Sequence, residues 1–210
     1  MSTGKPKLLD LCCKAGGASV GYWQAGFEVT GVDIEPQPHY PFTFVQHDAL
    51  TLDVSFLRQF DAIHMSPDCR GYSDTKNMHS NVYPRQTPEF RELAASYGGP
   101  YIIENVESSP LIGIKLCGQM FGLVTAAGKV LRRHRIFESN VFLFSPGKCF
   151  HKRDGSPSVV ATVAGHMFNQ MTGKELMGMS WEVTNDELAK AIPPAYTEFV
   201  GRQLIQFVRG

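Results

Sequence analysis

One cysteine of the sequence lies where a thiol could react. Cys69 belongs to the segment MSPDCRGYS (65–73), which follows an apolar run typical of a buried strand. Pro67 stiffens this loop, and Arg70 brings a positive charge beside the thiol, which needs such a charge or a nearby base to ionise at neutral pH. An isolated cysteine is also commonly a small buried hydrophobic residue, so this segment leaves both interpretations open.

Two further segments carry charged side chains beside apolar runs. Glu104 and Asn105 end the run YIIENV (101–106), where partial burial would raise the carboxyl pKa towards the acid–base range. Arg133 and Arg135 occur in LRRHRIF (131–137), and alternation along one strand would place both on the same face, towards one cleft. The alternatives are an ordinary strand-end carboxylate and a solvated charged face.

A glycine-rich turn near the N-terminus suits an adenosine-containing cofactor. The turn AGGAS (15–19) follows an apolar run, and a second run ends about 20 residues later in Asp33, which could accept hydrogen bonds from ribose hydroxyls. The turn is not GxGxxG, and Lys14 stands where a further glycine could be, so a cofactor without phosphates fits better. A glycine turn chosen only for a tight corner is the alternative.

These segments need a scaffold, and the order of apolar runs predicts one. The pattern predicts strands over 7–12, 27–33, 42–45, 61–65 and 101–103, and helices over 20–25, 54–59, 88–97 and 194–207. Such alternation is typical of an α/β fold with a doubly wound, mostly parallel sheet, in which ligands gather at the carboxyl ends of strands. The stretch 145–179 is predicted to form a small loop-rich lobe whose methionines serve packing.

Composition limits the class of protein. The 210 residues are 43% hydrophobic, enough for one α/β domain, and we expect no membrane span, no secretory signal and a cytoplasmic location. The formal net charge is zero, which argues against a globally basic nucleic-acid binder but allows local phosphate contacts. Five cysteines without a CxxC pair disfavour a disulfide framework. Cys149 and His151 form at most half a zinc site, so no metal is predicted.

Taken in order, six blocks resemble the DNA cytosine-5 methyltransferases, most of all their compact bacteriophage-type forms. The blocks are DLCCKAGGAS, GVDIE, SPDCRGYS, ENV, RRHRIF and AIPPAYTEFVGRQL, from about Leu8 to Leu204. The resemblance implies a Rossmann-like fold dependent on S-adenosylmethionine, which is left as S-adenosylhomocysteine after the methyl group passes to C5 of cytosine. It further implies a monomer that acts on double-stranded DNA with the target cytosine flipped out.

The resemblance also implies site residues. Cys69 would attack cytosine C6, Glu104 would act at N3 and the exocyclic amine, Arg133 would contact O2 and Arg135 would orient the glutamate. The implied cofactor-binding residues are Leu11, Ala15, Gly16, Gly17, Asp33, Ile34, Asp48, Ala49, Pro67, Ala191 and Ile192. The implied substrate-binding residues are Pro67, Ser73, Asn105, Arg133, Lys148, Lys152 and Arg153.

The chain departs from the family pattern in three loop residues and in length. Lys14 replaces a glycine, Asp68 a proline and Arg70 a glutamine. Only about fifty residues separate Phe137 from Ala191. We therefore expect a catalytic domain over 1–140 and 186–210 and a reduced target-recognition region over 141–185, with a short or degenerate target site or a specificity partner. Methylation of a free nucleotide or RNA, or a non-catalytic accessory role, are the alternatives.

Overall fold

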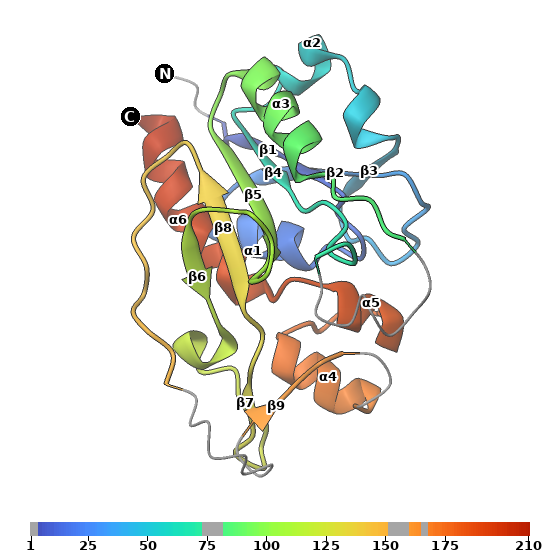
Figure 1. The fold of residues 1–210 in the computed structure, drawn as a ribbon, viewed down its shortest axis with the longest axis vertical. Helices are drawn as coiled ribbons and strands as arrows, with labels where there is room; N and C mark the ends of the chain where they lie inside the picture. The colour runs from blue at the N-terminus through green and yellow to red at the C-terminus, as the bar shows by residue number, and fades with distance from the viewer. Residues whose placement is uncertain (1–3, 73–81, 151–159, 165–167) are drawn as a thin grey trace.

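Seven strands form the central sheet of the computed structural model, which describes residues 4–72, 82–150, 160–164 and 168–210 (Figure 1). Its strand order is β3-β2-β1-β4-β5-β8-β6. The strands are β1 (Lys7–Leu11), β2 (Glu28–Asp33), β3 (Thr43–Gln46), β4 (Ala62–Met65), β5 (Tyr101–Val106), β6 (Ile114–Leu116) and β8 (Arg135–Ser139). The first five in spatial order run parallel, and β8 is antiparallel to both of its neighbours. The predicted doubly wound, mostly parallel sheet is confirmed.

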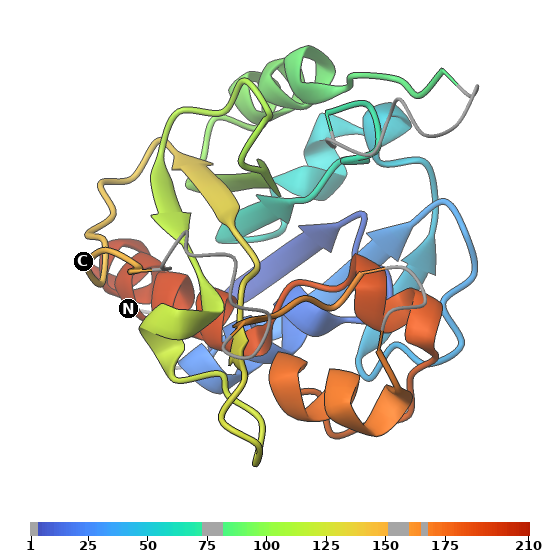
Figure 2. The same ribbon diagram turned by 60° about the horizontal axis from the view of Figure 1, so that its bottom comes forward.

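Helices cover both faces of this sheet (Figures 1 and 2). One face packs on α1 (Gly17–Ala25) and α6 (Pro194–Arg209), and the other on α2 (Val54–Leu57) and α3 (Thr87–Tyr97). The remaining elements are the 3₁₀ helices η1 (Ala49–Thr51) and η3 (Gly118–Phe121), the strand pair β7 (Val130–Leu131) and β9 (Val160–Ala161), and the helices α4 (Gln170–Met177) and α5 (Asn185–Lys190). Because both faces are covered, β1 and β4 read as apolar runs.

Helices α1 and α6 lie unusually close together, and glycine makes this possible. A Cβ on Gly21 would lie 2.1 Å from the carbonyl oxygen of Pro194 and 2.1 Å from Oγ1 of Thr197. Any larger residue at position 21 would therefore push the two helices apart. This contact brings the C-terminal block of the sequence against the helix that follows the glycine-rich turn.

The prediction of one strand over 131–137 is wrong. Strand β7 ends at Leu131 and β8 begins at Arg135. The main sheet pairs β8 with β5 and β6 only as far as Arg135, whereas the N–H of Arg132 donates to the carbonyl of Ala161 beside the small sheet. The intervening residues thus cross from one sheet to the other, which no period-2 pattern describes.

The stretch 145–179, predicted to be loop-rich, contains α4. Asn169 caps this helix by accepting a hydrogen bond from Thr172 N at 2.8 Å, and Gly178 ends it in the left-handed region at φ 68°. Met177 and Met179 are buried in a cluster shared with Ala15, so the packing interpretation holds for both. Met171 is exposed and Met167 lies outside the described residues.

No helix in the described part of the chain is both long and apolar enough to cross a bilayer.

Candidate active site

The loop after β4 and the end of β5 are joined directly. Asn105 Nδ2 donates to the carbonyl oxygen of Pro67 at 2.9 Å, and Asn105 Oδ1 accepts from the N–H of Val106 at 2.8 Å. Both Asn105 and Pro67 are buried. The loop that carries Cys69 is therefore held against the strand that carries Glu104, as the sequence predicted for strand ends of one sheet.

Glu104 is buried and forms an ion pair with the half-buried Arg135. Register pairs Glu104 with Phe137 and Val106 with Arg135, which puts Arg135 diagonally across from Glu104 on the same sheet face. Arg135 Nε lies 2.8 Å from Glu104 Oε1, although the N–H is not aligned for a hydrogen bond. Burial raises the pKa of Glu104, and the charges of Arg135 and Arg133 offset part of that rise.

Arg133 binds backbone carbonyl groups. Its Nη1 donates to Val163 O at 2.8 Å, and its Nη2 donates to Ala189 O and Ala191 O, both at 2.7 Å. Its Nε is buried and has no hydrogen-bond partner among the described residues. Burial, together with the like charge of Arg135, lowers the pKa of Arg133. Its guanidinium thus holds the 141–185 region and the C-terminal block against the site.

The thiol of Cys69 lies in the field of both arginines. Burial raises its pKa, Arg135 and Arg133 act to lower it, and Glu104 and Asp68 act to raise it further. Asp68 is paired with Arg70, whose Nη2 lies 2.5 Å from Asp68 Oδ2. Arg70 therefore pairs with the carboxylate beside the thiol, although Asp68 still acts to raise the pKa of Cys69.

The loop between β1 and α1, which the sequence predicts to bind the cofactor, is shaped by residues with positive φ. Cys12, Lys14 and Gly16 have φ of 63°, 46° and 85°, and the loop leads directly into α1. A Cβ on Gly17 would lie 2.4 Å from the carbonyl oxygen of Ile192, so this position also requires glycine. Trp181 Nε1 donates to the carbonyl of Ala15 at 3.0 Å, which ties the loop to the region after α4.

Lys14 covers the predicted ribose-binding acid. Its backbone N–H donates to Asp33 Oδ2 at 3.1 Å, and its Nζ lies 3.3 Å from Asp33 Oδ1 and 3.1 Å from Glu35 Oε2. Asp33 is only 2% exposed. Partial burial would lower the pKa of Lys14, but the two carboxylates outweigh it and raise that pKa. The sequence marked Lys14 as a departure but did not predict this ion pair.

The other predicted cofactor residues lie at or just after the carboxyl ends of β1, β2, β3 and β4 or in the C-terminal block. Ile34 is 63% exposed directly after Asp33, and the exposed Asp48 caps η1 by accepting from Leu50 N at 3.0 Å. The remaining residues of this set are buried: Leu11, Ala15, Gly16, Gly17, Ala49, Pro67, Ala191 and Ile192.

The predicted substrate contacts are placed less completely. Lys148 is exposed in the segment that follows β8. Ser73, Lys152 and Arg153 lie outside the described residues.

A buried polar network beneath the site was not predicted. Asp10 Oδ2 accepts from Ser19 Oγ at 2.5 Å, and Ser19 Oγ lies 2.7 Å from Tyr40 Oη. His64, in register with Asp10, has its Nδ1 3.0 Å from Tyr22 Oη. Burial raises the pKa of Asp10 to about 7 and lowers the pKa of His64 to about 3. Two features of the sequence could have indicated this network: the charged residue Asp10 within the apolar run LLDL, and His64 within the run AIHM.

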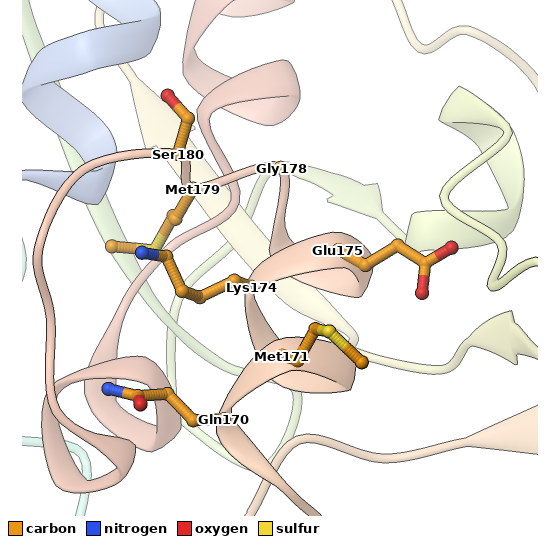
Figure 3. Close-up of a pocket in the computed structure, with 7 residues that line it drawn as sticks. All are labelled: Gln170, Met171, Lys174, Glu175, Gly178, Met179 and Ser180. Atoms are coloured by element: carbon orange, nitrogen blue, oxygen red, sulfur yellow. The ribbon is translucent and has the colours of Figure 1, made fainter.

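A hollow of about 640 Å³ lies on α4. In Figure 3 the side chains of Gln170 and Lys174 extend to one side of this helix and that of Glu175 to the other. Glu175 Oε1 accepts from the N–H of Ala126 at 2.8 Å. The hollow contains none of the predicted site residues; its lining is Gln170, Met171, Lys174, Glu175, Gly178, Met179 and Ser180.

Comparison with known proteins places this fold. The chain superposes on the crystal structure of S. pombe Dnmt2 methyltransferase with a TM-score of 0.65 at 12% identity, over 98% of this chain and 100% of that chain. The fold is that of methyltransferases. This Rossmann-like methyltransferase fold also gives a TM-score of 0.56 with Entamoeba histolytica methyltransferase EhMeth, at 10% identity over 99% of this chain and 100% of the other.

Sequence comparison adds a partial match. The putative methyltransferase YqeM of Bacillus subtilis (strain 168) is 34% identical over 83 residues, which are 35% of this chain and 33% of that protein. The match therefore spans about a third of the curated relative's length. No family model matches the chain. The structural similarity therefore shows a methyltransferase fold, whereas the activity and the substrate depend on the residues of the site.

Proposed function

We propose that this protein transfers a methyl group from S-adenosylmethionine to C5 of cytosine in double-stranded DNA. The observation that carries the proposal is the cluster of Cys69, Glu104, Arg133 and Arg135, in which Glu104 and Arg133 are buried, with the Cys69 loop held by Asn105. A thiol, a carboxyl group of raised pKa and two guanidinium groups are what addition to a cytosine ring needs.

The chemistry divides between these residues. The Cys69 thiolate forms a bond to C6, the ring electrons move to make C5 nucleophilic, and Glu104 delivers a proton to N3 so that negative charge does not accumulate. Arg133 Nε, buried and unpartnered among the described residues, would donate to O2, while Arg135 holds the Glu104 carboxyl group in place. Once C5 carries the methyl group, the C5 proton passes to solvent water and the N3 proton returns to Glu104. The electron pair of the C5–H bond re-forms the C5–C6 double bond as the C6–S bond breaks, and Cys69 leaves as a thiolate.

The cofactor supplies the electrophilic methyl group on its sulfonium. The residues at the ends of β2 and β3 fit it: Asp33 would hold ribose hydroxyls, Ile34 presents exposed apolar surface for adenine, and Asp48 would accept from the adenine amine. Gly16 and Gly17 let the backbone of the loop come close to the ligand. Lys14 must release Asp33 when ribose binds.

We assign catalysis to residues 1–140 and 186–210 and a reduced recognition role to 141–185. The short second region favours a target of few bases, since base-edge readout needs side chains placed in a groove. Sequencing of methylated product tests this assignment. A six-base specific site recognised by this chain alone would contradict it.

Tritiated methyl transfer tests the function. The full chain is incubated with labelled cofactor and, in parallel, unmethylated duplex DNA, RNA of the same sequence and deoxycytidine monophosphate. We expect label in DNA, lost in Cys69→Ala while calorimetric binding of S-adenosylmethionine persists. DNA with 5-fluorocytosine should trap a Cys69-dependent covalent complex, because fluorine cannot leave C5 as a proton does.

The three substrates separate the alternatives. Label in RNA or the nucleotide alone would replace DNA as the substrate, an outcome that zero net charge makes worth testing. Cofactor binding without transfer to any of the three would mean either that a specificity partner is missing or that the protein is a non-catalytic accessory protein.

A further inference from the structure

Three potential metal ligands come together at the far side of the Arg133–Arg135 segment. They are Cys117, just after β6, His134, between the two arginines, and Cys149, in the segment after β8. Their Sγ and ring nitrogen atoms all lie within 4.8 Å of one another. We propose that these three residues bind one zinc ion or a similar thiophilic divalent cation, in a site separate from the cofactor loop.

The separations match tetrahedral coordination. Zn–S bonds of about 2.3 Å and Zn–N bonds of about 2.0 Å put a sulfur and a nitrogen ligand about 3.5 Å apart around a tetrahedral ion. Cys149 Sγ lies 3.3 Å from His134 Nε2. A shift of a few tenths of an ångström would admit the ion, and two thiolates with one imidazole form a donor set that zinc prefers.

A second, independent observation concerns the other ring nitrogen of the histidine. His134 Nδ1 lies 2.6 Å from Glu107 Oε2, and Lys115 Nζ holds the other Glu107 oxygen at 3.0 Å. A carboxylate at Nδ1 fixes the proton there and leaves the Nε2 lone pair directed at the two sulfur atoms. Metal-ligating histidines nearly always carry such a partner, which orients the ring and raises its basicity.

The backbone also brings the third ligand into place. Phe150 N donates to Gln119 Oε1 at 2.7 Å, and Gln119 Nε2 donates to Phe150 O at 3.3 Å. These two bonds clamp the residue after Cys149 onto η3, which begins one residue after Cys117. The cysteines are thus brought together before any ion binds.

The ion would join three segments that the β6–β8 pairing and the Gln119–Phe150 hydrogen bonds already bring together. It would tie the start of the 141–185 region and the end of β6 to His134, and so hold the backbone between Arg133 and Arg135. The site is therefore structural, and its existence does not depend on which substrate is methylated.

Metal content and cobalt substitution of the full-length protein test the proposal. We expect reduced wild-type protein to bind one zinc ion per chain by elemental analysis. Its Co²⁺ form should show thiolate-to-cobalt charge transfer and the visible bands of tetrahedral cobalt. Cys149→Ser should lose both signals, and Glu107→Gln should weaken zinc affinity about 10- to 100-fold because it removes the partner of Nδ1.

Cys69→Ser is the matched control, because it removes a thiol outside the cluster and should keep the zinc and the cobalt spectrum. Circular dichroism of each variant confirms that it is folded. The proposal is overturned if reduced wild-type protein takes up no zinc or cobalt, if Cys149→Ser binds both as wild type does, or if Cys117 and Cys149 remain joined by a disulfide after treatment with a reducing agent. None of these results would alter the methyl-transfer assay, so the two proposals can fail separately.

Discussion

The side-chain amide of Asn105 donates a 2.9 Å hydrogen bond to the carbonyl oxygen of Pro67, two residues before Cys69. Asn105 is 1% exposed, and its own carbonyl is occupied by the N–H of Val106. The amide therefore has one orientation and one function, which is to fix the cysteine loop relative to Glu104. A covalent mechanism needs a constant separation between the Cys69 loop and the Glu104 carboxyl group.

Replacing Asn105 with leucine should separate positioning from binding. The variant leaves the buried Pro67 carbonyl unsatisfied, which we expect to lower the free energy of unfolding by about 1–3 kcal/mol. The turnover number should fall while the dissociation constant for S-adenosylmethionine stays unchanged, as single-turnover kinetics and calorimetry would show. Asn140→Ala, which removes a surface amide at the opposite end of β5, is the control. Equal rates for Asn105→Leu and Asn140→Ala would refute the positioning role.

Arg133→Lys and Arg135→Lys should behave differently. Lysine at 133 cannot reach the three carbonyl groups of Val163, Ala189 and Ala191, so we expect a loss of about 2–4 kcal/mol in the free energy of unfolding and weaker cofactor binding. Lysine at 135 keeps the charge beside Glu104 and should mainly reduce the rate. Urea denaturation and calorimetry measure both effects. A stable Arg133→Lys protein with normal cofactor affinity would contradict this division.

Lys14→Gly should bind S-adenosylmethionine more tightly than wild type. It removes a half-exposed ion pair worth about 1 kcal/mol that ribose must displace from Asp33, which corresponds to roughly a fivefold gain in affinity. It also relieves a non-glycine residue at φ 46°. Lys14→Ala removes the ion pair alone, so calorimetry of both variants separates the two causes. Weaker binding by both would mean that Lys14 itself contacts the cofactor.

Asp10 and His64 should make opposite contributions to the pH dependence of stability. Burial raises the pKa of Asp10 from 3.8 to about 7, so its contribution favours the folded state at low pH and is lost as the pH rises from 3.8 to about 7. Burial lowers the pKa of His64 from 6.5 to about 3, so its contribution is present above pH 6.5 and is lost as the pH falls to about 3. Between pH 3.8 and 6.5 the two slopes cancel.

Single variants should expose each slope. Relative to wild type, Asp10→Asn should lose about 1.4 kcal/mol of unfolding free energy per pH unit on acidification from pH 6.5 to 4, and His64→Asn should gain as much. Denaturant titrations at several pH values provide the test. Curves of both variants parallel to wild type would show that neither group titrates differently in the folded state.

Local sequence was sufficient for the elements that position the site. The apolar runs before Asp33 and Glu104 predicted buried parallel strands, because a strand covered on both faces must be apolar whatever its neighbours are. The small residues after β1 predicted the turn into α1 for a similarly local reason. The same logic failed for residues 131–137, where the chain leaves one sheet for another and the alternation of side chains has no single surface to follow.

Only the tertiary structure decided which side chains meet. Arg133 donates hydrogen bonds to carbonyl groups 30, 56 and 58 residues away. Lys14 pairs with the Asp33 carboxylate, which lies 19 residues further along the chain at the end of the next strand. Cys117, His134 and Cys149 carry no shared spacing that predicts a metal site, yet they converge. The hydrophobic periodicity of a strand or helix is set by residues that are near one another in sequence, so it can be predicted from a short segment. Contacts between distant residues depend on how whole elements pack, and that is set by the fold as a unit.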